Sequence, residues 1–242
     1  MGVFSAIKTF LSKYVFSNEW RCLSCGKEIF GDEKFCDKCY SKLPFIKGAI
    51  CDHCGRKLIA FQNYCSTCKE HLLSVDKCRS VFEYAPPVSD MIKRLKYGNQ
   101  RYLVDYFAER LGFLYLKNYM SADYVTYVPM TKKAYRRRGY NQSELLARAV
   151  AKNVNLPLFN GIEKVKETKR QATLGRKERL INLEQAFSVV DRKSVKNKKF
   201  VIVDDVTTTG ATAEAVAKRL KRAGASEVFL ITVASLSPKD KY

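Results

Sequence analysis

The 242-residue sequence contains no long hydrophobic run. No uninterrupted apolar segment approaches the roughly 20 residues that a membrane-spanning helix needs, so we expect no stable insertion into a membrane. Residues 1–16 carry apolar side chains at roughly helical spacing, but they lack the continuous apolar region and the small-residue cleavage site of a signal peptide. We therefore expect a short amphipathic helix at this end and a cytoplasmic location.

The sequence also lacks the loop G-x-x-x-x-G-K-[ST], in which backbone amides and a lysine bind the phosphates of a nucleotide. Its absence argues against a helicase or ATPase of the P-loop class. One apolar strand of this sequence ends in acidic residues, as the Walker B strand of those enzymes does. Without the phosphate-binding loop, these acidic residues need another explanation.

Acidic residues are scarce relative to basic ones. The chain has 44 Lys and Arg against 24 Asp and Glu, a formal net charge of +20. Residues 1–80 contain 13 bases and 8 acids, so the remaining 31 bases and 16 acids leave most of the excess after residue 80. Such a charge favours a polyphosphate ligand, nucleic acid or both. Solubility is the plain alternative, but it usually brings mixed charges, and residues 132–138 contain five bases and no acid.

Eight of the nine cysteines form two copies of one pattern. Each copy has two C-x-x-C pairs separated by ten residues, and a glycine follows the second cysteine, where a zinc knuckle needs a tight turn. Four thiolates bind one tetrahedral Zn²⁺, which predicts two structural zinc ribbons in tandem and two Zn²⁺. Disulfides are the alternative, but a cytosolic-looking chain without an export signal argues against them. The predicted ligands are Cys22, Cys25, Cys36 and Cys39 in the first copy, and Cys51, Cys54, Cys65 and Cys68 in the second.

The stretch VIVDDVTTTGAT joins an apolar strand to polar residues. Asp204 and Asp205 follow the apolar residues 200–203, and a threonine-rich turn leads into a predicted helix at 211–223 and a further strand at 228–233. This order places the paired acids at the carboxyl edge of a parallel sheet, where open α/β folds bind ligands. Loop amides and the helix N-terminus form an anion site, and the carboxylates suit a vicinal diol or hydrated Mg²⁺. A capped helix is the plain alternative, but one cap does not need six polar positions.

The middle of the chain has a similar order of elements. We predict strands at 79–84, 123–128 and 186–190, and helices at 88–97 and 102–117. Asn141, with Glu144 three residues later, indicates a capping box at the start of another helix. Two basic segments are predicted as loops, and the second is a candidate for a mobile lid. Solvated surface is the alternative for both segments, which are 132–138 and 164–179.

The stretch FVIVDDVTTTGAT resembles the loop that binds phosphoribosyl pyrophosphate (PRPP) in type I phosphoribosyltransferases. In that family the paired acids bind the ribose hydroxyls and the following turn binds the 5-phosphate. The resemblance therefore implies that Asp204 and Asp205 bind ribose. It implies that the phosphate is bound by Thr207, Thr208, Thr209, Gly210, Ala211 and Thr212. The motif does not identify the second substrate.

The joint order of motifs resembles the ComF family, which is associated with DNA uptake and natural transformation. The motifs cover nearly the whole chain: the cysteine repeat, LPF, LKYG, RRRGYNQ, RQATLGRKERLINLEQAF and the PRPP loop. Tyr140 stands where phenylalanine is expected, so an aromatic ring is kept. The implied fold is α/β, with a mostly parallel sheet flanked by helices as in type I phosphoribosyltransferases, at 79–242. An N-terminal helix and double zinc ribbon are expected at 1–78.

The resemblance implies a Mg²⁺-dependent PRPP-binding protein that acts in competence or DNA processing. Turnover would displace pyrophosphate from the anomeric carbon through a transition state with oxocarbenium character. The residues expected at the pyrophosphate are Thr131, Lys132 and Lys133. Those expected at the lid and acceptor side are Arg138, Asn141, Arg170, Gln171, Arg176 and Arg179.

Two other functions stay open. The protein is alternatively a binding module that senses PRPP or a nucleotide, holds single-stranded DNA and docks a ComFA-like helicase through its ribbons. In that case Tyr135 and Tyr140, which flank the arginines, are candidates for base stacking. A nucleobase salvage phosphoribosyltransferase is the third possibility, although such an enzyme needs neither tandem ribbons nor so basic a surface.

Overall fold

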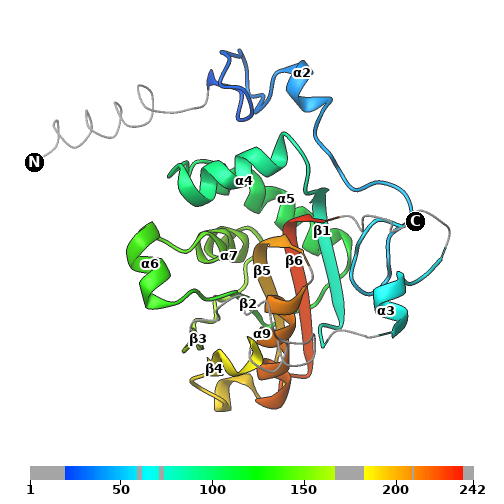
Figure 1. The fold of residues 1–242 in the computed structure, drawn as a ribbon, viewed down its shortest axis with the longest axis vertical. Helices are drawn as coiled ribbons and strands as arrows, with labels where there is room; N and C mark the ends of the chain where they lie inside the picture. Colours follow the sequence, from blue (N-terminus) through cyan, green and yellow to red (C-terminus); the bar gives the residue numbers. More distant parts are fainter. Residues whose placement is uncertain (1–19, 59–61, 71–73, 167–182, 209, 237–242) are drawn as a thin grey trace, which may run out of the picture. The chain divides into compact units, whose positions relative to one another are not determined.

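A computed structural model describes residues 20–58, 62–70, 74–166, 183–208 and 210–236. The chain divides into two compact units, Met1–Leu43 and Pro44–Tyr242, which are described separately (Figure 1). The domain boundary after residue 78 was predicted from the cysteine repeat. In the structure this repeat extends over both units, and the second ribbon lies in the same unit as the sheet. The described part of the first unit contains the first four cysteines and the one-turn helix α2, Asp37–Tyr40.

The centre of the second unit is a parallel four-stranded sheet in the order β1-β6-β5-β2. Almost every residue of β5 and β6 is buried or partly buried, as expected for parallel strands covered on both faces. The predicted mostly parallel sheet is confirmed. The strands are β1 (Lys77–Glu83), β2 (Tyr124–Tyr127), β5 (Lys199–Thr207) and β6 (Glu227–Ser235).

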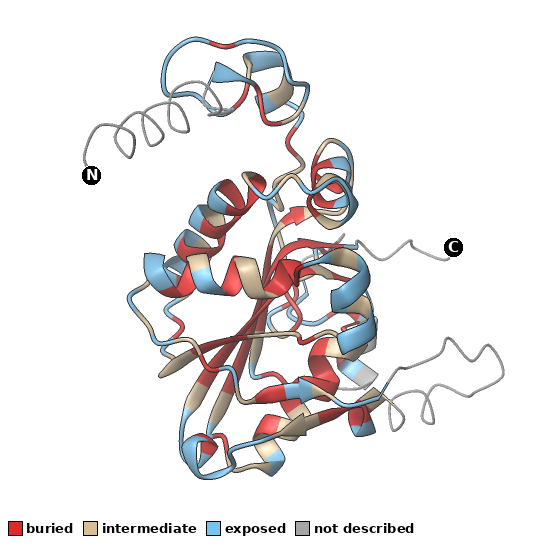
Figure 2. Cartoon of the chain, turned by 90° about the vertical axis from the view of Figure 1, so that its left-hand side faces the viewer, coloured by how far each residue is buried: buried red, intermediate tan, exposed pale blue. Residues whose placement is uncertain are grey.

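Helices cover both faces of this sheet. Phe200 and Ile202 of β5 share a buried cluster with Val216 and Leu220 of α9. Because side chains alternate along a strand, the residues between them face the opposite side, where α7 contacts β2 and β5 and α5 contacts β1 and β6. Figure 2 shows the buried colour along the strands and on the helix sides next to them. The helices named here are α5 (Leu103–Lys117), α7 (Gln142–Asn153) and α9 (Ala211–Arg222).

Shorter elements complete the second unit. Helix α4, Val88–Tyr97, has the predicted bounds, and α3 (Ser66–Glu70) belongs to the second ribbon. β3 (Ile162–Lys164) and β4 (Phe187–Val189) form a two-stranded antiparallel sheet, followed by the 3₁₀ turn η2, Lys193–Val195. Most of the predicted lid, 167–179, lies outside the described residues. No helix in the described ranges is long and apolar enough to span a membrane.

The first basic segment differs from its prediction. Residues predicted as a loop form the seven-residue helix α6, Lys132–Arg138. The Thr131 hydroxyl caps it by accepting a hydrogen bond from the Ala134 amide at 3.2 Å, and Gly139 ends it with φ +82°. Arginine and lysine are good helix formers, so a local cap and a left-handed glycine suffice for a short helix between β2 and α7.

Candidate functional site

The paired carboxylates lie where β5 extends beyond its neighbour β2. The last paired residue of β2 is Tyr127, opposite Val203, whereas β5 continues to Thr207 beside β6. From Asp204 onward, one side of β5 is therefore open to the elements that follow β2. Asp204 is partly buried and Asp205 is 3% exposed. The sequence-predicted position of both acids toward the carboxyl end of a parallel strand is confirmed.

The start of α7 supplies hydrogen bonds to both carboxylates. The Ser143 hydroxyl donates to Asp204 Oδ1 at 2.6 Å, and the Gln142 amide donates to Asp205 Oδ1 at 3.1 Å. Asn141 caps this helix: its Oδ1 accepts from the Ser143 amide, and its Nδ2 donates to the Val128 carbonyl. The cap thus joins the end of β2 to the helix that positions the carboxylates.

A lysine from α4 completes the carboxylate pair. The Lys96 ammonium forms an ion pair with Asp205 Oδ2. Burial alone would lower the pKa of Lys96, but the charges of Asp205 and Asp204 outweigh this effect and raise it. Burial, and second the charge of Asp205, raise the pKa of Asp204 to about 7, although hydrogen bonds from Ser143 and from the Asp205 amide act against the rise.

The turn after β5 leads into the N-terminus of α9. Thr207 is buried at the end of β5, Thr208 is exposed, and Gly210 has φ +78° immediately before the helix begins at Ala211. Positive φ at Gly210 permits the sharp change from strand to helix. Ala211 and Thr212, both partly buried, form the first turn of α9, and Thr209 lies outside the described residues. Apart from Thr209, the structure brings the predicted phosphate-binding residues to one turn beside the carboxylates.

Only some of the other predicted site residues lie near the carboxylates in the structure. Arg138 donates to the Gln142 side-chain oxygen, so it lies one contact away from Asp205. Lys132 and Lys133 are exposed on α6. The side-chain oxygen and nitrogen of Asn141 both bind backbone groups, so in the structure this residue positions the start of α7. Its role toward the substrate stays a prediction. Four predicted residues lie outside the described ranges: Arg170, Gln171, Arg176 and Arg179.

Tyr140 requires a correction. It was a candidate for stacking on nucleobases, but it is 5% exposed and its hydroxyl donates to the Leu95 carbonyl. The Arg101 guanidinium lies 4.4 Å from its ring centroid. The ring is therefore used inside the fold, where it connects the α6–α7 turn to α4. Tyr97, in contrast, is 74% exposed, and the Arg138 guanidinium lies 5.1 Å from its ring centroid.

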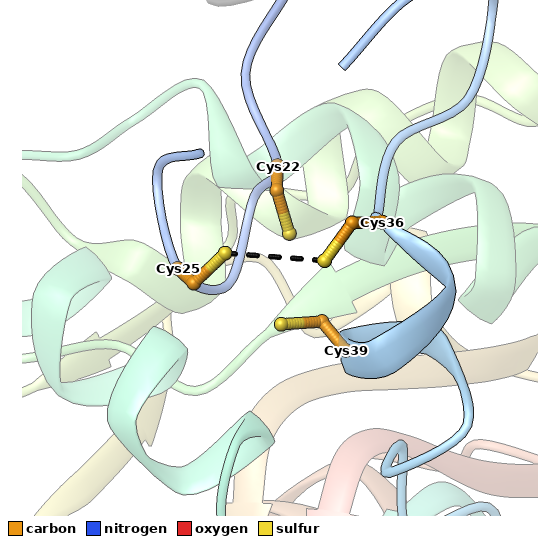
Figure 3. Close-up of side chains that lie close together, drawn as sticks. All are labelled: Cys22, Cys25, Cys36 and Cys39. Carbon is orange, nitrogen blue, oxygen red and sulfur yellow. Dashed lines mark hydrogen bonds between the residues drawn. The ribbon is translucent and has the colours of Figure 1, made fainter. Parts of the chain in front are cut away.

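Each four-cysteine set converges on one point. All four Sγ atoms of each set lie within 4.8 Å of one another, and Figure 3 shows the side chains of the first set directed inward. Thiolates that share a tetrahedral Zn²⁺ lie about 3.8 Å apart, because each Zn–S bond is about 2.3 Å. The Cys25–Cys36 and Cys54–Cys65 sulfur distances of 4.0 Å and 3.6 Å fit this spacing. The cysteines are unpaired thiols, so the two sets fit two Zn²⁺.

The protein environment also prepares the sulfurs for a metal. Burial acts to raise the pKa of Cys22 and Cys51, but nearby backbone amides outweigh it and lower each pKa to about 7. Burial first, and then the charges of Cys51 and Cys65, raise the pKa of Cys54 to about 12. A bound cation removes that repulsion, because the thiolate is the form that binds metal.

The first C-x-x-C knuckle of the second ribbon, Cys51–Cys54, contacts both the sheet and the turn that follows β5. The Cys78 amide of β1 donates to the His53 carbonyl at 2.8 Å, and the buried Arg79 guanidinium donates to the Asp52 carbonyl at 2.9 Å. Arg56, just after the knuckle, donates to the backbone carbonyl of Thr208. The second ribbon therefore supports the turn that follows the carboxylates. Cys78, the cysteine outside the two four-cysteine sets, is 1% exposed.

Comparison with known proteins agrees with this architecture. Residues 11–69 match the double zinc ribbon domain, and residues 141–241 match the phosphoribosyl transferase domain. Competence protein F of Haemophilus influenzae is 31% identical over 218 residues, which cover 86% of this chain and 94% of that protein. The chain belongs to the ComF family. Its α/β domain therefore has the type I phosphoribosyltransferase fold, and the double zinc ribbon precedes it.

Two further relatives support the ComF assignment. Competence protein ComFC of Bacillus subtilis is 29% identical over 212 residues, covering 85% of this chain and 84% of that protein. The DNA utilization protein YhgH of Escherichia coli K12 is 31% identical over 159 residues, covering 62% of this chain and 67% of that protein. The resemblance stated from the motifs is confirmed.

The sequence patterns assigned no role to four residues that the structure places at this ComF site. Lys96 lies in the LKYG element and Gln142 in RRRGYNQ, so the motifs contained both without showing what they contact. Ser143 lies just after the RRRGYNQ motif, and Arg56 lies just after the Cys51–Cys54 knuckle. Their positions next to recognised motifs were the available signal, but only the folded chain shows their partners.

Proposed function

We propose that this ComF protein binds PRPP together with Mg²⁺ at the carboxyl end of β5 and acts in DNA uptake, where it handles single-stranded DNA. The supporting observation is the partly buried Asp204, whose Oδ1 is held by Ser143, next to a glycine turn that leads into α9. A carboxylate accepts hydrogen bonds from ribose hydroxyls, and backbone amides at a helix N-terminus suit a phosphate. The relatives named for competence and DNA utilization support the biological role.

The site residues fit the charge and shape of PRPP. Asp204 and Asp205 would bind the ribose, and the turn from Thr207 to Thr212 would bind the 5-phosphate. Thr131, the basic residues Lys132 and Lys133, and the predicted lid arginines would face the pyrophosphate and the acceptor. PRPP supplies an anomeric carbon with pyrophosphate as the leaving group, whose charge Mg²⁺ neutralises. The chain would orient the sugar and exclude water from it.

Calorimetric titration with PRPP and Mg²⁺ tests this proposal. Asp204→Asn together with Asp205→Asn should weaken binding at least tenfold, about 1.4 kcal/mol, because neutral amides are poorer acceptors for the hydroxyls. Asp90→Asn is the matched control, because Asp90 is exposed on α4 and pairs only with Lys93 among the described residues. Equal affinity of the double variant and the wild type would rule out this ligand site.

Catalysis and sensing are separate forms of the same proposal. Pyrophosphate release from PRPP, measured with and without single-stranded DNA or nucleobases, distinguishes them. Release that depends on an acceptor supports a phosphoribosyltransferase and identifies the acceptor class. Binding without release supports a PRPP-sensing module. Release with a free nucleobase alone supports a salvage enzyme.

The proposed DNA surface is centred on α6. Arg136 and Arg137 are exposed, and the exposed rings of Tyr135 and Tyr97 lie on α6 and at the end of α4. Arginines neutralise DNA phosphates, and exposed aromatic rings stack on bases. This surface adjoins the carboxylate site, because Arg138 contacts both Tyr97 and Gln142.

Salt-dependent binding of single-stranded DNA tests the surface. Arg136→Ala with Arg137→Ala should weaken binding and reduce the slope of log affinity against log salt by roughly 0.7 for each lost contact. Arg192→Ala with Lys193→Ala is the control, because these exposed bases precede the amino end of β5, whereas the carboxylates lie toward its carboxyl end. If both double variants lost the same affinity for DNA, binding would depend on the net charge of the protein and not on this surface.

A ComFA-like helicase is the proposed protein partner, and a cytoplasmic location follows from a role in handling incoming DNA. The two zinc ribbons are the proposed docking module. Mixing the zinc-loaded protein with the purified helicase, followed by size-exclusion chromatography, should give a complex. Absence of a complex with or without DNA would reject this partner.

A further inference from the structure

Lys96 differs from the other lysine on the same side of α4. Its ammonium pairs with Asp205, and the two side chains are 23% and 4% exposed. Lys93 lies one turn earlier and pairs with Asp90, but those side chains are 58% and 57% exposed. The Lys93 pair is an ordinary surface contact. The Lys96 pair brings a cation into the ligand site from an element that is remote in sequence.

Each oxygen of Asp205 has one protein partner. Oδ1 accepts from Gln142, and Oδ2 pairs with Lys96. Asp204 is different, because among the described residues its donors, Ser143 and the Asp205 amide, both contact Oδ1. The two adjacent acids are therefore not equivalent. Asp204 retains an oxygen that no donor among the described residues contacts, whereas each oxygen of Asp205 already has one protein partner.

In this arrangement the Lys96 ammonium compensates the carboxylate charge, as a bound metal ion otherwise would. Two adjacent carboxylates attract hard divalent cations, which bind through carboxylate oxygens. A buried carboxylate also needs a compensating charge, because its desolvation is costly. The Lys96 ammonium provides that charge and occupies the Asp205 oxygen that a cation would coordinate.

We infer that Lys96 is the resident counter-ion of the carboxylate pair, which prevents direct coordination of a divalent ion by Asp205 while both acids stay acceptors for the ribose hydroxyls. Lys96 is thus a positioning residue that acts through Asp205. The inference depends on the proposed function only in naming the ligand, because the exclusion of a divalent ion is a property of the protein without PRPP.

Titration of the zinc-loaded full-length protein with Mn²⁺ alone, followed by electron paramagnetic resonance, tests this inference. Lys96→Met should bind one Mn²⁺ at least tenfold more tightly than the wild type. Lys96→Arg should behave as the wild type, because it restores the cation. Lys93→Met is the matched control and should not change Mn²⁺ binding. Lys96→Met combined with Asp205→Asn should lose the gained site.

Two results would overturn the inference. One is equal Mn²⁺ affinity in the wild type and in folded Lys96→Met. The other is tight Mn²⁺ binding by the wild type that Asp205→Asn abolishes, which decides the matter even if Lys96→Met does not fold. Failure of PRPP to bind the wild type would instead contradict the proposed function, and the Mn²⁺ result would stand apart from it.

Discussion

The glycine after the second cysteine of each ribbon provides a matched test of how the second ribbon packs. Gly26 and Gly55 occupy the same place in the repeat and have φ of +74° and +67°. A Cβ added at Gly26 meets no described atom within 4 Å. A Cβ at Gly55 lies 2.3 Å from the Cys78 carbonyl oxygen and 3.0 Å from the Arg79 Cα. Alanine is therefore strained at both positions, but only Gly55 lacks space for it.

The structure gives the size of the difference. An L-residue in the left-handed region costs about 1–2 kcal/mol at either position. At Gly55 the knuckle must also move away from β1, which breaks two hydrogen bonds: the one from the Cys78 amide to the His53 carbonyl and the one from the Arg79 guanidinium to the Asp52 carbonyl. Each lost hydrogen bond costs about 1 kcal/mol. We therefore expect a loss of about 3–4 kcal/mol for Gly55→Ala, against about 1–2 kcal/mol for Gly26→Ala.

Urea unfolding of the zinc-loaded protein measures this loss, and a chelator measures zinc release. Gly55→Ala should have the lower free energy of unfolding and release one of two Zn²⁺ more readily. It should also weaken PRPP binding, because Arg56 then no longer supports Thr208, whereas Gly26→Ala should bind PRPP as the wild type does. Equal destabilisation by the two substitutions would refute the packing argument.

Three further predictions concern the metal, the buried tyrosine and pH. Freshly purified reduced protein should contain two Zn²⁺, and each ribbon should unfold when its metal is removed; metal analysis that finds one Zn²⁺ or none would contradict this. Tyr140→Phe should lower the free energy of unfolding by about 1 kcal/mol through loss of the bond to Leu95, without changing affinity for single-stranded DNA. Asp204 has a pKa of about 7 in the folded protein against about 3.9 when unfolded, so its stabilising contribution is present below about pH 4 and is lost as pH rises through 7. The melting temperature of the wild type should therefore fall relative to that of Asp204→Asn between about pH 4 and pH 7, and parallel curves would refute the shift.

The sequence by itself determined the features that depend on short spacing. Both zinc sites follow from C-x-x-C pairs, because the ligands of each pair lie on one turn. Helix α4 has the bounds predicted from the sequence, and α9 ends just before Gly224, which has φ +102°. The carboxylates and the following turn were recognised because strand, acids, turn and helix are consecutive. In each case residues close in the chain carry the constraint.

The same local reasoning failed where two structures suit one composition. The run KKAYRRR was predicted as a loop because of its charge, yet Thr131 and Gly139 provide the ends of a helix. Tyr140 was considered for stacking because it follows three arginines. Its ring is buried because α4 and the turn before α7 approach each other, and nothing within the motif reports that approach.

Only the tertiary structure decided how distant residues share the site. Lys96, Gln142 and Ser143 reach the two carboxylates because α4 and α7 pack beside the open edge of β5, and their partners lie at least 61 residues away in the chain. The two ribbons show the same limit, since their cysteine patterns are alike. Gly55 packs against β1 and its neighbour Arg56 contacts the ligand turn, whereas Gly26 has open space among the described residues. The repeat specifies how each knuckle binds metal, but the surface on which a knuckle rests depends on the packing of the whole unit.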